Sequence, residues 1–313
     1  MKIFLILLSV FFLVLTIAMF VFAISQLKLM LARSDSKQVP KGFDTSFFQN
    51  SPLKAAIEKG MSAMESLPNE DLYITSFDGL KLHAYFYPCP EKTSKFVLGI
   101  HGFKSGPRRE FAPYIEYYHS KGYNLVIPDD RGHWKSEGNQ LGMGVLDRTD
   151  CKDWAVYMVE KFGENIKILL HGVSMGGATV AAASGEETLP EQVKGIICDC
   201  GYTSMYQQLK YHIRENFHMP VFPVANIANL SCKIVAGYDF KTATPVSQVA
   251  KSHTPTLFVH GENDKMVPTY MAEELYEACS AKKRLLIIAG AAHAESIAVA
   301  PEKYHKAIEE FLM

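Results

Sequence analysis

The feature that most constrains the fold is an alternation of short apolar runs with longer helical stretches, which starts near residue 71 and continues to the C-terminus. Apolar runs such as 96–100, 166–171 and 256–260 have the length of buried strands, and the stretches between them have the length of helices. Strands that alternate with helices form a largely parallel sheet covered on both faces. The sequence therefore predicts an α/β fold with a mostly parallel, doubly wound sheet.

Turn signals and strand ends add detail to this prediction. Asp78-Gly79 is a strong turn signal between two strand-like runs, 72–75 and 82–87, and predicts a hairpin. In an open sheet of this kind, ligands bind beyond the carboxyl ends of the strands. The residues that directly follow the strands are therefore the candidates for a functional site. The other expected strands are 96–100, 124–128, 166–171, 193–198, 256–260 and 284–288, and the expected helices are 53–66, 109–120, 146–162, a segment from 175, 269–278 and 302–312.

An uncharged apolar segment, residues 3–24, lies at the N-terminus. As a helix, its 22 residues would be about 33 Å long, close to the thickness of a bilayer's hydrocarbon core. A cleaved signal peptide is the alternative, because Lys2 supplies a positive start and Ala23-Ile24-Ser25 resembles a cleavage site. The run is longer than the roughly 7–15 residues of a signal-peptide core. We therefore expect an uncleaved, single-pass transmembrane helix.

Charges beside this segment bear on its orientation. Lys28, Arg33, Lys37 and Lys41 follow it, whereas Lys2 and the amino terminus precede it. Positive residues are retained on the cytoplasmic side, so the pattern predicts that the C-terminal domain is cytoplasmic. The opposite topology stays open, because long domains can translocate despite their charges.

The chain is expected to divide into three parts. Residues 1–26 form the transmembrane anchor, residues 27–70 form a juxtamembrane connector, and residues 71–313 form the α/β domain. Within that domain, the alternation of strands and helices is interrupted over residues 201–252.

Composition excludes some classes of protein. With 32 basic and 33 acidic residues the formal net charge is −1, which lacks the basic footprint of a nucleic-acid-binding protein. None of the six cysteines forms a Cys-x-x-Cys pair, so zinc and dithiol redox motifs are absent. Cys198 and Cys200 would lie about 6.6 Å apart on one face of a strand with parallel Cβ vectors, which is poor disulfide geometry. We expect buried, unpaired cysteines and a reducing compartment.

The most informative motif is Gly172-Val173-Ser174-Met175-Gly176, which has the form Gly-x-Ser-x-Gly. It follows the apolar run 166–170 and opens a helix-compatible run, 177–182. A strand, a tight turn and a helix place the serine on a strained elbow with its hydroxyl projecting from the sheet. Ser174 is therefore a candidate nucleophile.

A serine hydroxyl needs a base to accept its proton. His293 is the best placed of eleven histidines, since it follows the last expected strand. An acid that orients the histidine is expected between the two, after the preceding strand. Asp264 occupies that position, and Glu262 is a weaker substitute. The sequence thus predicts the order nucleophile, acid and base: Ser174, Asp264 and His293.

Negative charge that develops on a substrate oxygen requires hydrogen-bond donors. His101-Gly102-Phe103-Lys104 follows the expected strand 96–100, and the backbone amide of Phe103 is one candidate donor. The amide of Met175, directly after the elbow serine, is the other. We expect these two amides to form an oxyanion hole.

These motifs, in this order, resemble the serine hydrolases of the α/β-hydrolase superfamily, in particular its bacterial esterase-like and peptidase-like members. The resemblance runs from about residue 72 to the C-terminus and includes His101-Gly102-Phe103, the Asp-Arg-Gly segment 130–138, the serine elbow, and the loops of Asp264 and His293. In this family the loop corresponding to 130–138 shapes the floor of the active site. Serine at position 174 argues against the haloalkane dehalogenase branch, which has aspartate there.

The resemblance also implies that residues 201–252 form a cap insertion over the site. The aromatic and apolar side chains of this cap would either line an acyl or aromatic pocket or pack the cap onto the domain. Lys210, Arg214 and Lys241 would either meet an acidic substrate or face solvent. The aromatic and apolar residues are Tyr202, Tyr206, Tyr211, Phe217, Met219, Phe222 and Tyr238.

The function that the resemblance implies is acyl transfer to water through an acyl-enzyme on Ser174. A carboxylic ester is the leading substrate class, followed by thioesters, amides and short peptides. Other functions stay open: an acyltransferase or peptidase that uses the same residues, a non-catalytic ligand-binding homologue, and a purely structural membrane protein. No metal or organic cofactor is implied, and the oligomeric state stays open.

Overall fold

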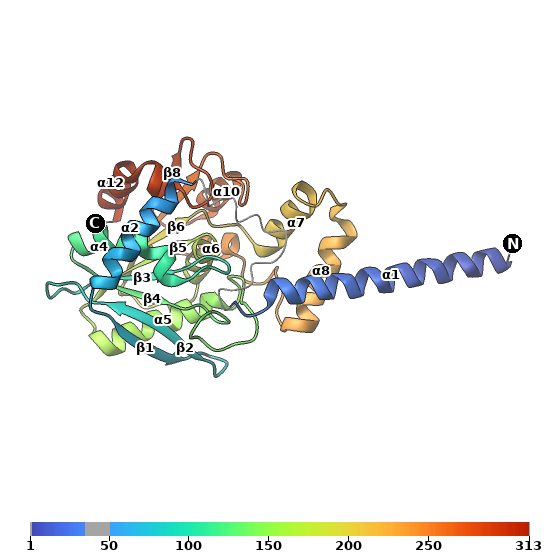
Figure 1. Ribbon diagram of the computed structural model, residues 1–313, viewed down its shortest axis with the longest axis horizontal. Coiled ribbons are helices and arrows are strands. Elements are labelled where there is room, and N and C mark those ends of the chain that lie inside the picture. Colours follow the sequence, from blue (N-terminus) through green and yellow to red (C-terminus); the bar gives the residue numbers. More distant parts are fainter. Residues whose placement is uncertain (1, 35–50, 313) are drawn as a thin grey trace.

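The computed structural model describes residues 2–34 and 51–312. The core of the protein is an eight-stranded sheet with the order β1-β2-β4-β3-β5-β6-β7-β8 (Figure 1). The strands are β1 (Glu70–Thr75), β2 (Lys81–Tyr87), β3 (Lys95–Ile100), β4 (Tyr123–Pro128), β5 (Lys167–Val173), β6 (Val193–Asp199), β7 (Thr256–Gly261) and β8 (Lys283–Ile288). β2 is antiparallel to β1 and β4, and the other neighbouring strands are parallel. The expected hairpin and mostly parallel α/β sheet are confirmed.

Helices connect the strands. They are α1 (Lys2–Leu31), α2 (Pro52–Ser66), α3 (Pro107–Phe111), the 3₁₀ turn η2 (Ala112–Tyr114), α4 (Ile115–Ser120), α5 (Asp147–Phe162), α6 (Met175–Ala183), α7 (Met205–Glu215), α8 (Val221–Ala236), α9 (Pro245–Val249), α10 (Tyr270–Ala278), α11 (Ser296–Val299) and α12 (Pro301–Leu312). The expected helix 109–120 is divided into α3, η2 and α4, because Pro113 has no N–H to continue a regular helix. α7, α8 and α9 lie in the segment expected to form the cap.

The sheet is packed on both faces, as parallel strands require. Val97 of β3 belongs to a cluster that contains Tyr304 of α12, whereas its neighbour Leu98 belongs to a second cluster that contains Trp154 of α5. β4 and β7 are buried along their whole length. Two apolar layers therefore hold the central strands in place.

The chain reverses its direction of winding at the centre of the sheet. β4 lies on one side of β3, and α5 then carries the chain back to β5 on the other side. The carboxyl ends of β3 and β5 therefore lie side by side at a topological switch point, where α/β proteins bind ligands. The loops that carry Phe103 and Ser174 leave the sheet at this point.

α1 projects from the sheet domain (Figure 1). Its 30 residues make it about 45 Å long, and by length and composition it is the one candidate membrane span among the described residues. Leu27 and Leu31 near its end are buried in the domain. The boundary predicted at residues 26 and 27 thus falls inside this helix. Lys37 and Lys41, which were used to predict orientation, lie outside the described residues, as does the part of the expected connector from 35 to 50.

The residues directly after α1 are joined to a loop of the domain. Ala32 and Ser34 form isolated β-bridges with Gln140 and His133. The Arg33 guanidinium donates hydrogen bonds to carbonyl oxygens of the same loop. The base of the apolar helix is therefore part of the folded domain.

Candidate active site

β5 and α6 meet at Ser174 in a tight turn. Ser174 has φ 59° and ψ −116°, a backbone conformation that residues with a side chain rarely adopt. A Cβ atom at Gly176 would lie 2.0 Å from the carbonyl oxygen of Ile100, and one at Gly172 would lie 2.0 Å from that of Gly176. Only glycine fits at both positions. Ser174 is also the one residue between 168 and 184 that is not buried.

Three residues far apart in the sequence meet at this elbow. His293 Nε2 lies 2.8 Å from Ser174 Oγ, and His293 Nδ1 lies 2.7 Å from Asp264 Oδ2. Asp264 follows β7 and His293 follows β8, so the sheet brings both loops to the elbow. Glu262, the weaker candidate for the acid, instead accepts a hydrogen bond of 3.0 Å from the amide of Gly290. The structure thus joins the predicted nucleophile, base and acid in one hydrogen-bond chain.

Electrostatic effects reinforce this chain. Burial opposes protonation of His293, but the Asp264 carboxylate outweighs that effect and raises the pKa of His293 above its ordinary value. Burial likewise opposes ionisation of Asp264, but His293 and His260 outweigh it and hold the pKa of Asp264 well below its usual range. An ionised Asp264 therefore favours the protonated form of His293.

Asp264 is fixed by partners besides His293. The amides of Met266 and Val267 each donate a 2.9 Å hydrogen bond to Asp264 Oδ1. His260 Nε2 lies 3.1 Å from Asp264 Oδ2. Sequence analysis did not predict the contact with His260, and the spacing of four residues between the two was the available signal.

The loop after β3 lies against Ser174. A Cβ atom at Gly102 would lie 3.3 Å from Ser174 Cβ, so Phe103, the next residue, borders the elbow. Met175 is the first residue of α6, and its amide is among those that have no partner within the helix. The two amides expected to form the oxyanion hole are therefore on the segments that border Ser174.

Glu110 is a further acid at this loop, and sequence analysis missed it because no motif or periodicity marks it. Its carboxylate accepts a hydrogen bond from Ser105 Oγ and lies 3.8 Å from the position of a Cβ atom at Gly102. Burial raises the pKa of Glu110, and the hydrogen bond from Ser105 only partly offsets this effect. Glu110 therefore braces the loop that carries Phe103.

A buried polar network lies behind Ser174. The amide of Ser174 donates a 2.8 Å hydrogen bond to the carbonyl oxygen of Asp199, whose Oδ2 accepts one of 2.8 Å from the Tyr304 hydroxyl. His171 lies 3.1 Å from the Tyr304 hydroxyl and 2.8 Å from the Tyr118 hydroxyl. Burial raises the pKa of Asp199 to about 6 and lowers the pKa of His171 to about 3. This network supports the backbone on which Ser174 is mounted.

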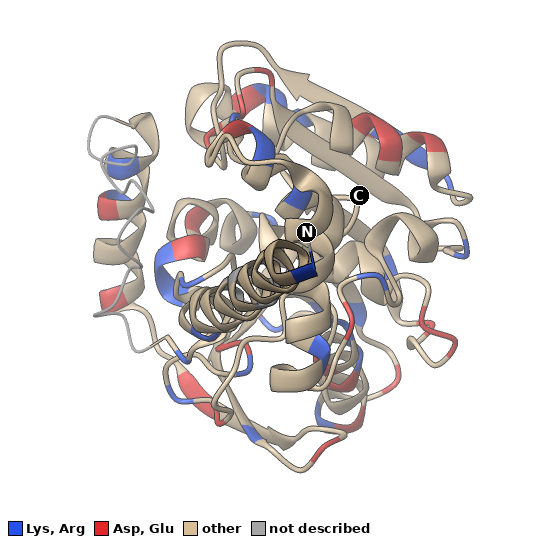
Figure 2. Ribbon diagram, turned by 90° about the vertical axis from the view of Figure 1, so that its right-hand side faces the viewer, with Lys and Arg blue, Asp and Glu red and all other residues tan. Residues whose placement is uncertain are grey.

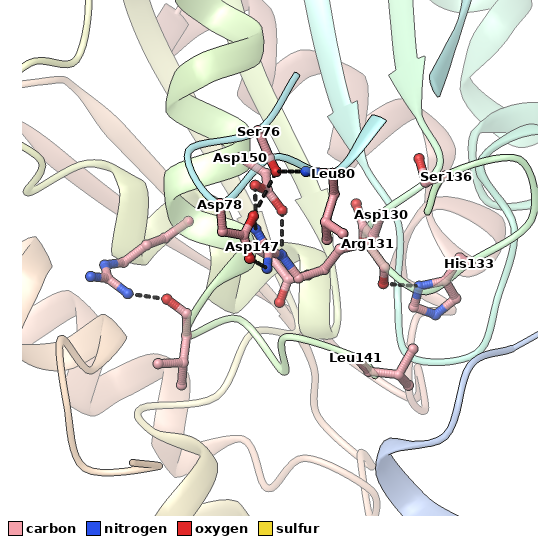
Figure 3. A network of polar contacts seen from close by, with 12 residues as sticks. Ser76, Asp78, Leu80, Asp130, Arg131, His133, Ser136, Leu141, Asp147 and Asp150 are labelled. Atoms are coloured by element: carbon pink, nitrogen blue, oxygen red, sulfur yellow. Dashed lines mark hydrogen bonds and ion pairs between the residues drawn. The ribbon is translucent and has the colours of Figure 1, made fainter. Parts of the chain in front are cut away.

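The Asp-Arg-Gly segment is held by a buried arginine (Figure 3). Arg131 Nε and Nη2 donate hydrogen bonds of 2.6 and 2.7 Å to the carboxylate of Asp150 on α5. Arg131 Nη1 donates one of 2.8 Å to Asp78 in the β1–β2 turn. The amide of Asp130 donates to His101 Nε2 at 3.1 Å, which ties the segment to the end of β3. One guanidinium thus connects three separate parts of the chain.

One group of potential metal ligands is found within residues 2–34 and 51–312. It consists of Cys200, Asp264 and His293, whose ligand atoms lie within 4.8 Å of one another. Asp264 and His293 are already hydrogen-bonded to each other, and burial raises the pKa of the Cys200 thiol, which disfavours the thiolate that binds metals. The arrangement fits the serine site better than a metal centre. All six cysteines are unpaired.

The cap residues singled out from the sequence fall into different environments. Tyr202 and Tyr238 are buried, and their hydroxyls donate to carbonyl oxygens of the domain at 2.9 and 2.7 Å. They pack the cap onto the domain. Phe217, Met219 and Phe222 are exposed.

The fold and the serine elbow define a serine hydrolase of the α/β-hydrolase superfamily. Residues 109–312 match the prolyl oligopeptidase family (Peptidase_S9), so the chain belongs to that family. The matched region contains Ser174, Asp264 and His293.

Two relatives span most of the chain. The uncharacterized protein YqkD of Bacillus subtilis is 26% identical over 264 residues, which cover 83% of this chain and 85% of YqkD. An uncharacterized membrane protein of Saccharomyces cerevisiae is 24% identical over 249 residues, which cover 79% of this chain and 80% of the yeast protein. Together with the apolar helix α1, the yeast relative indicates that the chain associates with a membrane.

Solved structures show the same fold. The esterase Pf2001 of Pyrococcus furiosus superimposes with a TM-score of 0.62 and 20% identity, over 80% of this chain and 96% of that chain. The acylaminoacyl peptidase of Pyrococcus horikoshii superimposes with a TM-score of 0.58 and 18% identity, over 80% of this chain and 43% of that chain. At these identities the similarity concerns the fold alone.

Proposed function

We propose that the chain is a membrane-anchored serine hydrolase that cleaves a carboxylic ester through an acyl-enzyme. The observation that carries the proposal is the continuous hydrogen-bond chain from Ser174 Oγ through His293 to Asp264, at 2.8 and 2.7 Å. A serine on a strained elbow, joined to a histidine and a buried carboxylate, is the arrangement that activates a hydroxyl for attack on a carbonyl.

The reaction follows from these positions. His293 Nε2 accepts the proton of Ser174 as Oγ attacks the ester carbonyl carbon, and the amides of Phe103 and Met175 donate to the resulting oxyanion. The intermediate collapses when the C–O bond to the alcohol breaks and His293 donates its proton to that oxygen. A water molecule then attacks the acyl-enzyme with His293 again as base, and the acid is released as Ser174 regains its proton. Asp264 holds the histidine tautomer throughout.

The ester is the leading substrate class, and an amide or peptide bond is the second candidate. Membership of the prolyl oligopeptidase family is the reason to keep a peptide bond as a candidate. An acyltransferase would use the same residues, with an alcohol, amine or thiol in place of water. A non-catalytic ligand-binding role would leave the hydrogen-bonded Ser174, His293 and Asp264 without a purpose.

The anchoring part of the proposal rests on α1. Its charge-free residues 3–27 are long enough to cross the hydrocarbon core once, and the lysines after it favour a cytoplasmic domain. Protease protection in sealed vesicles tests this topology, because a domain on the protected side resists digestion until the vesicles are lysed.

The catalytic part is tested with the full chain in detergent micelles. The wild type and Ser174→Ala are compared for labelling by a fluorophosphonate and for turnover of short p-nitrophenyl esters. We expect labelling and turnover in the wild type, and neither in Ser174→Ala. A folded wild type that shows neither would contradict the proposal, and turnover of p-nitroanilides in preference to esters would establish the peptidase instead.

A further inference from the structure

The cap carries an unusual apolar surface next to α1. Phe217, Phe222 and Ile234 are 67%, 76% and 63% exposed, and Met219 and Leu230 are exposed as well. We call these five side chains the cap apolar face. They lie on α8 and on the turn that joins it to α7, and α8 carries a single charged residue, Lys233. Large apolar side chains exposed on one helix and the turn beside it mark a site of interaction.

This face lies beside the part of α1 that would leave the membrane. Phe20 and Ile24 are partly buried and Leu27 and Leu31 are buried, and their spacing places them on one side of α1. Leu27 and Leu31 share an apolar cluster with Cys232 of α8, and α8 crosses α1 near the C-terminal end of α1 (Figure 1). Figure 2, which views the molecule from the side on which α1 projects, shows the helix running towards the viewer from this region.

The length of the uncharged stretch of α1 indicates where the cap would lie relative to the bilayer. The uncharged residues 3–27 of α1 span about 38 Å, compared with about 30 Å for a hydrocarbon core. Leu27, the last residue of this uncharged stretch, shares an apolar cluster with Cys232 of α8. Because α8 crosses α1 where the uncharged stretch ends, a bilayer that holds α1 would have its boundary between acyl chains and headgroups near α8.

The charges of the region suit the same position. Residues 201–252 contain five basic and two acidic residues. Lys28 follows the uncharged stretch, and Lys104 lies beside α1, where its Nζ donates a 3.0 Å hydrogen bond to the carbonyl oxygen of Leu29. Basic residues beside an apolar surface favour a layer of anionic headgroups.

The membrane-facing elements are also those that border the candidate active site. Gln208 and Tyr211 of α7 donate to the carbonyl oxygens of Met266 and Lys265, at 2.7 and 3.0 Å, in the loop that holds Asp264. On the other side, the loop of Phe103 is tied to α1 through Lys104. Both walls of the site are thus attached to the parts of the molecule that meet the bilayer.

We propose that the cap apolar face is immersed in the interfacial layer of the bilayer that α1 crosses, and that the substrate is a long-chain acyl ester held in that bilayer. The position of the cap is independent of catalysis, whereas the substrate class rests on the proposed hydrolase function. The ester enters the site from the bilayer, so its acyl chain does not cross water, and the shorter, polar product leaves on the aqueous side.

Immersion of the cap is tested without any turnover. The full chain with Phe222→Trp is reconstituted in vesicles of phosphatidylcholine with a minority of phosphatidylglycerol, with and without lipid brominated near the headgroup end of its acyl chains. We expect bromine to reduce the emission added by Phe222→Trp about twofold, since an interfacial side chain lies within reach of it. Phe77→Trp, at an exposed position in the β1–β2 turn, is the matched control and should not be quenched.

Equal, unquenched emission from both variants would overturn the proposal. Emission from Phe222→Trp that changes with the density of protein in the vesicles would also overturn it, because the cap apolar face would then be covered by a second copy of the chain.

The substrate class is tested by a ratio of two rates. Turnover of a long-chain fluorogenic ester embedded in the same vesicles is divided by turnover of p-nitrophenyl acetate in solution. We expect the ratio to fall about tenfold when Phe217, Phe222 and Ile234 are all replaced by serine, because each lost apolar side chain weakens interfacial binding. The matched variant with Tyr73, Phe77 and Val299 replaced by serine removes the same number of exposed apolar side chains and should keep the wild-type ratio.

An unchanged ratio in the variant of Phe217, Phe222 and Ile234 would overturn the proposed substrate class. If Ser174→Ala turns over both probes like the wild type, the hydrolase proposal fails, while the quenching result still decides the position of the cap.

Discussion

The carbonyl oxygen of Leu31, the last residue of α1, accepts a 2.8 Å hydrogen bond from the amide of Leu141. Both side chains are buried in the cluster that contains Met175, the residue after the candidate nucleophile. The C-terminal end of the apolar helix is therefore packed against the domain. The helix ends inside the domain, close to the serine elbow.

The first prediction concerns this junction. Leu31→Ala would leave a cavity in the cluster and should lower the free energy of unfolding by about 2–5 kcal/mol. Leu29→Ala, on the exposed side of the same helix, should change it by less than about 0.5 kcal/mol. Thermal unfolding of the full chain in detergent measures both. Equal melting temperatures for the two variants would show that α1 does not dock as described.

The second prediction concerns the acid of the site. Asp264→Asn should reduce kcat by about four orders of magnitude, because the histidine loses the carboxylate that orients it and stabilises its charged form. Glu262→Gln should have a small effect, since Glu262 contacts the amide of Gly290 and not His293. Steady-state kinetics on a p-nitrophenyl ester compares the two. A larger loss in Glu262→Gln would reverse the assignment.

The same variant changes the pH profile. Asp264 raises the pKa of His293, so in the wild type activity is lost as the pH falls through that raised value. Removing the carboxylate lowers the pKa of His293, and the acid limb of kcat/KM for the residual activity of Asp264→Asn should move to lower pH. If activity of Asp264→Asn is lost at the same acidic pH as in the wild type, a group other than His293 titrates there.

The third prediction concerns Asp199. Its folded-state pKa of about 6 exceeds the ordinary value of 3.8, so the folded protein binds this proton more tightly than the unfolded chain does. The group's contribution to stability is complete below pH 3.8 and is lost as the pH rises through 6. The difference of about two units between the folded and the ordinary pKa corresponds to about 3 kcal/mol of folding free energy. Asp199→Asn lacks this loss, so its stability relative to the wild type should rise by up to that amount between pH 4 and pH 7, measured by denaturant titration. A difference that is independent of pH would contradict the ionisation of Asp199.

The fourth prediction concerns the elbow. In Gly176→Ala the new Cβ atom would lie 2.0 Å from the carbonyl oxygen of Ile100. This oxygen belongs to the backbone of β3, which cannot move aside as a flexible side chain can. We expect a loss of more than about 3 kcal/mol of stability and no fluorophosphonate labelling. Gly122→Ala is the control, because Gly122 has φ 75° with nothing near its Cβ position, and should cost about 1 kcal/mol. Similar melting temperatures for the two variants would refute the close approach at Gly176.

Much of the fold and the candidate site could be predicted from the sequence. Apolar periodicity and turn residues are properties of short segments of sequence. The strands, the hairpin and the elbow around Ser174 could therefore be predicted from the residues within each segment. The chain order of Ser174, Asp264 and His293 also carries information, because successive strands of a parallel sheet end at the same edge. The division of the expected helix 109–120 is local as well, and Pro113 was sufficient reason to expect it.

Only the tertiary structure decided the rest. Tertiary contacts join segments whose positions depend on the whole sheet. They are the hydrogen bond between Ser105 and Glu110 beside the loop of Phe103, the ion pairs of Arg131 with Asp78 and Asp150, and the packing of Leu31. No periodicity links such residues, because their contacts arise where loops from different strands converge. The sequence by itself determined which elements form and in what order. The packing of those elements determined which side chains meet, since that depends on the distances that the assembled sheet imposes.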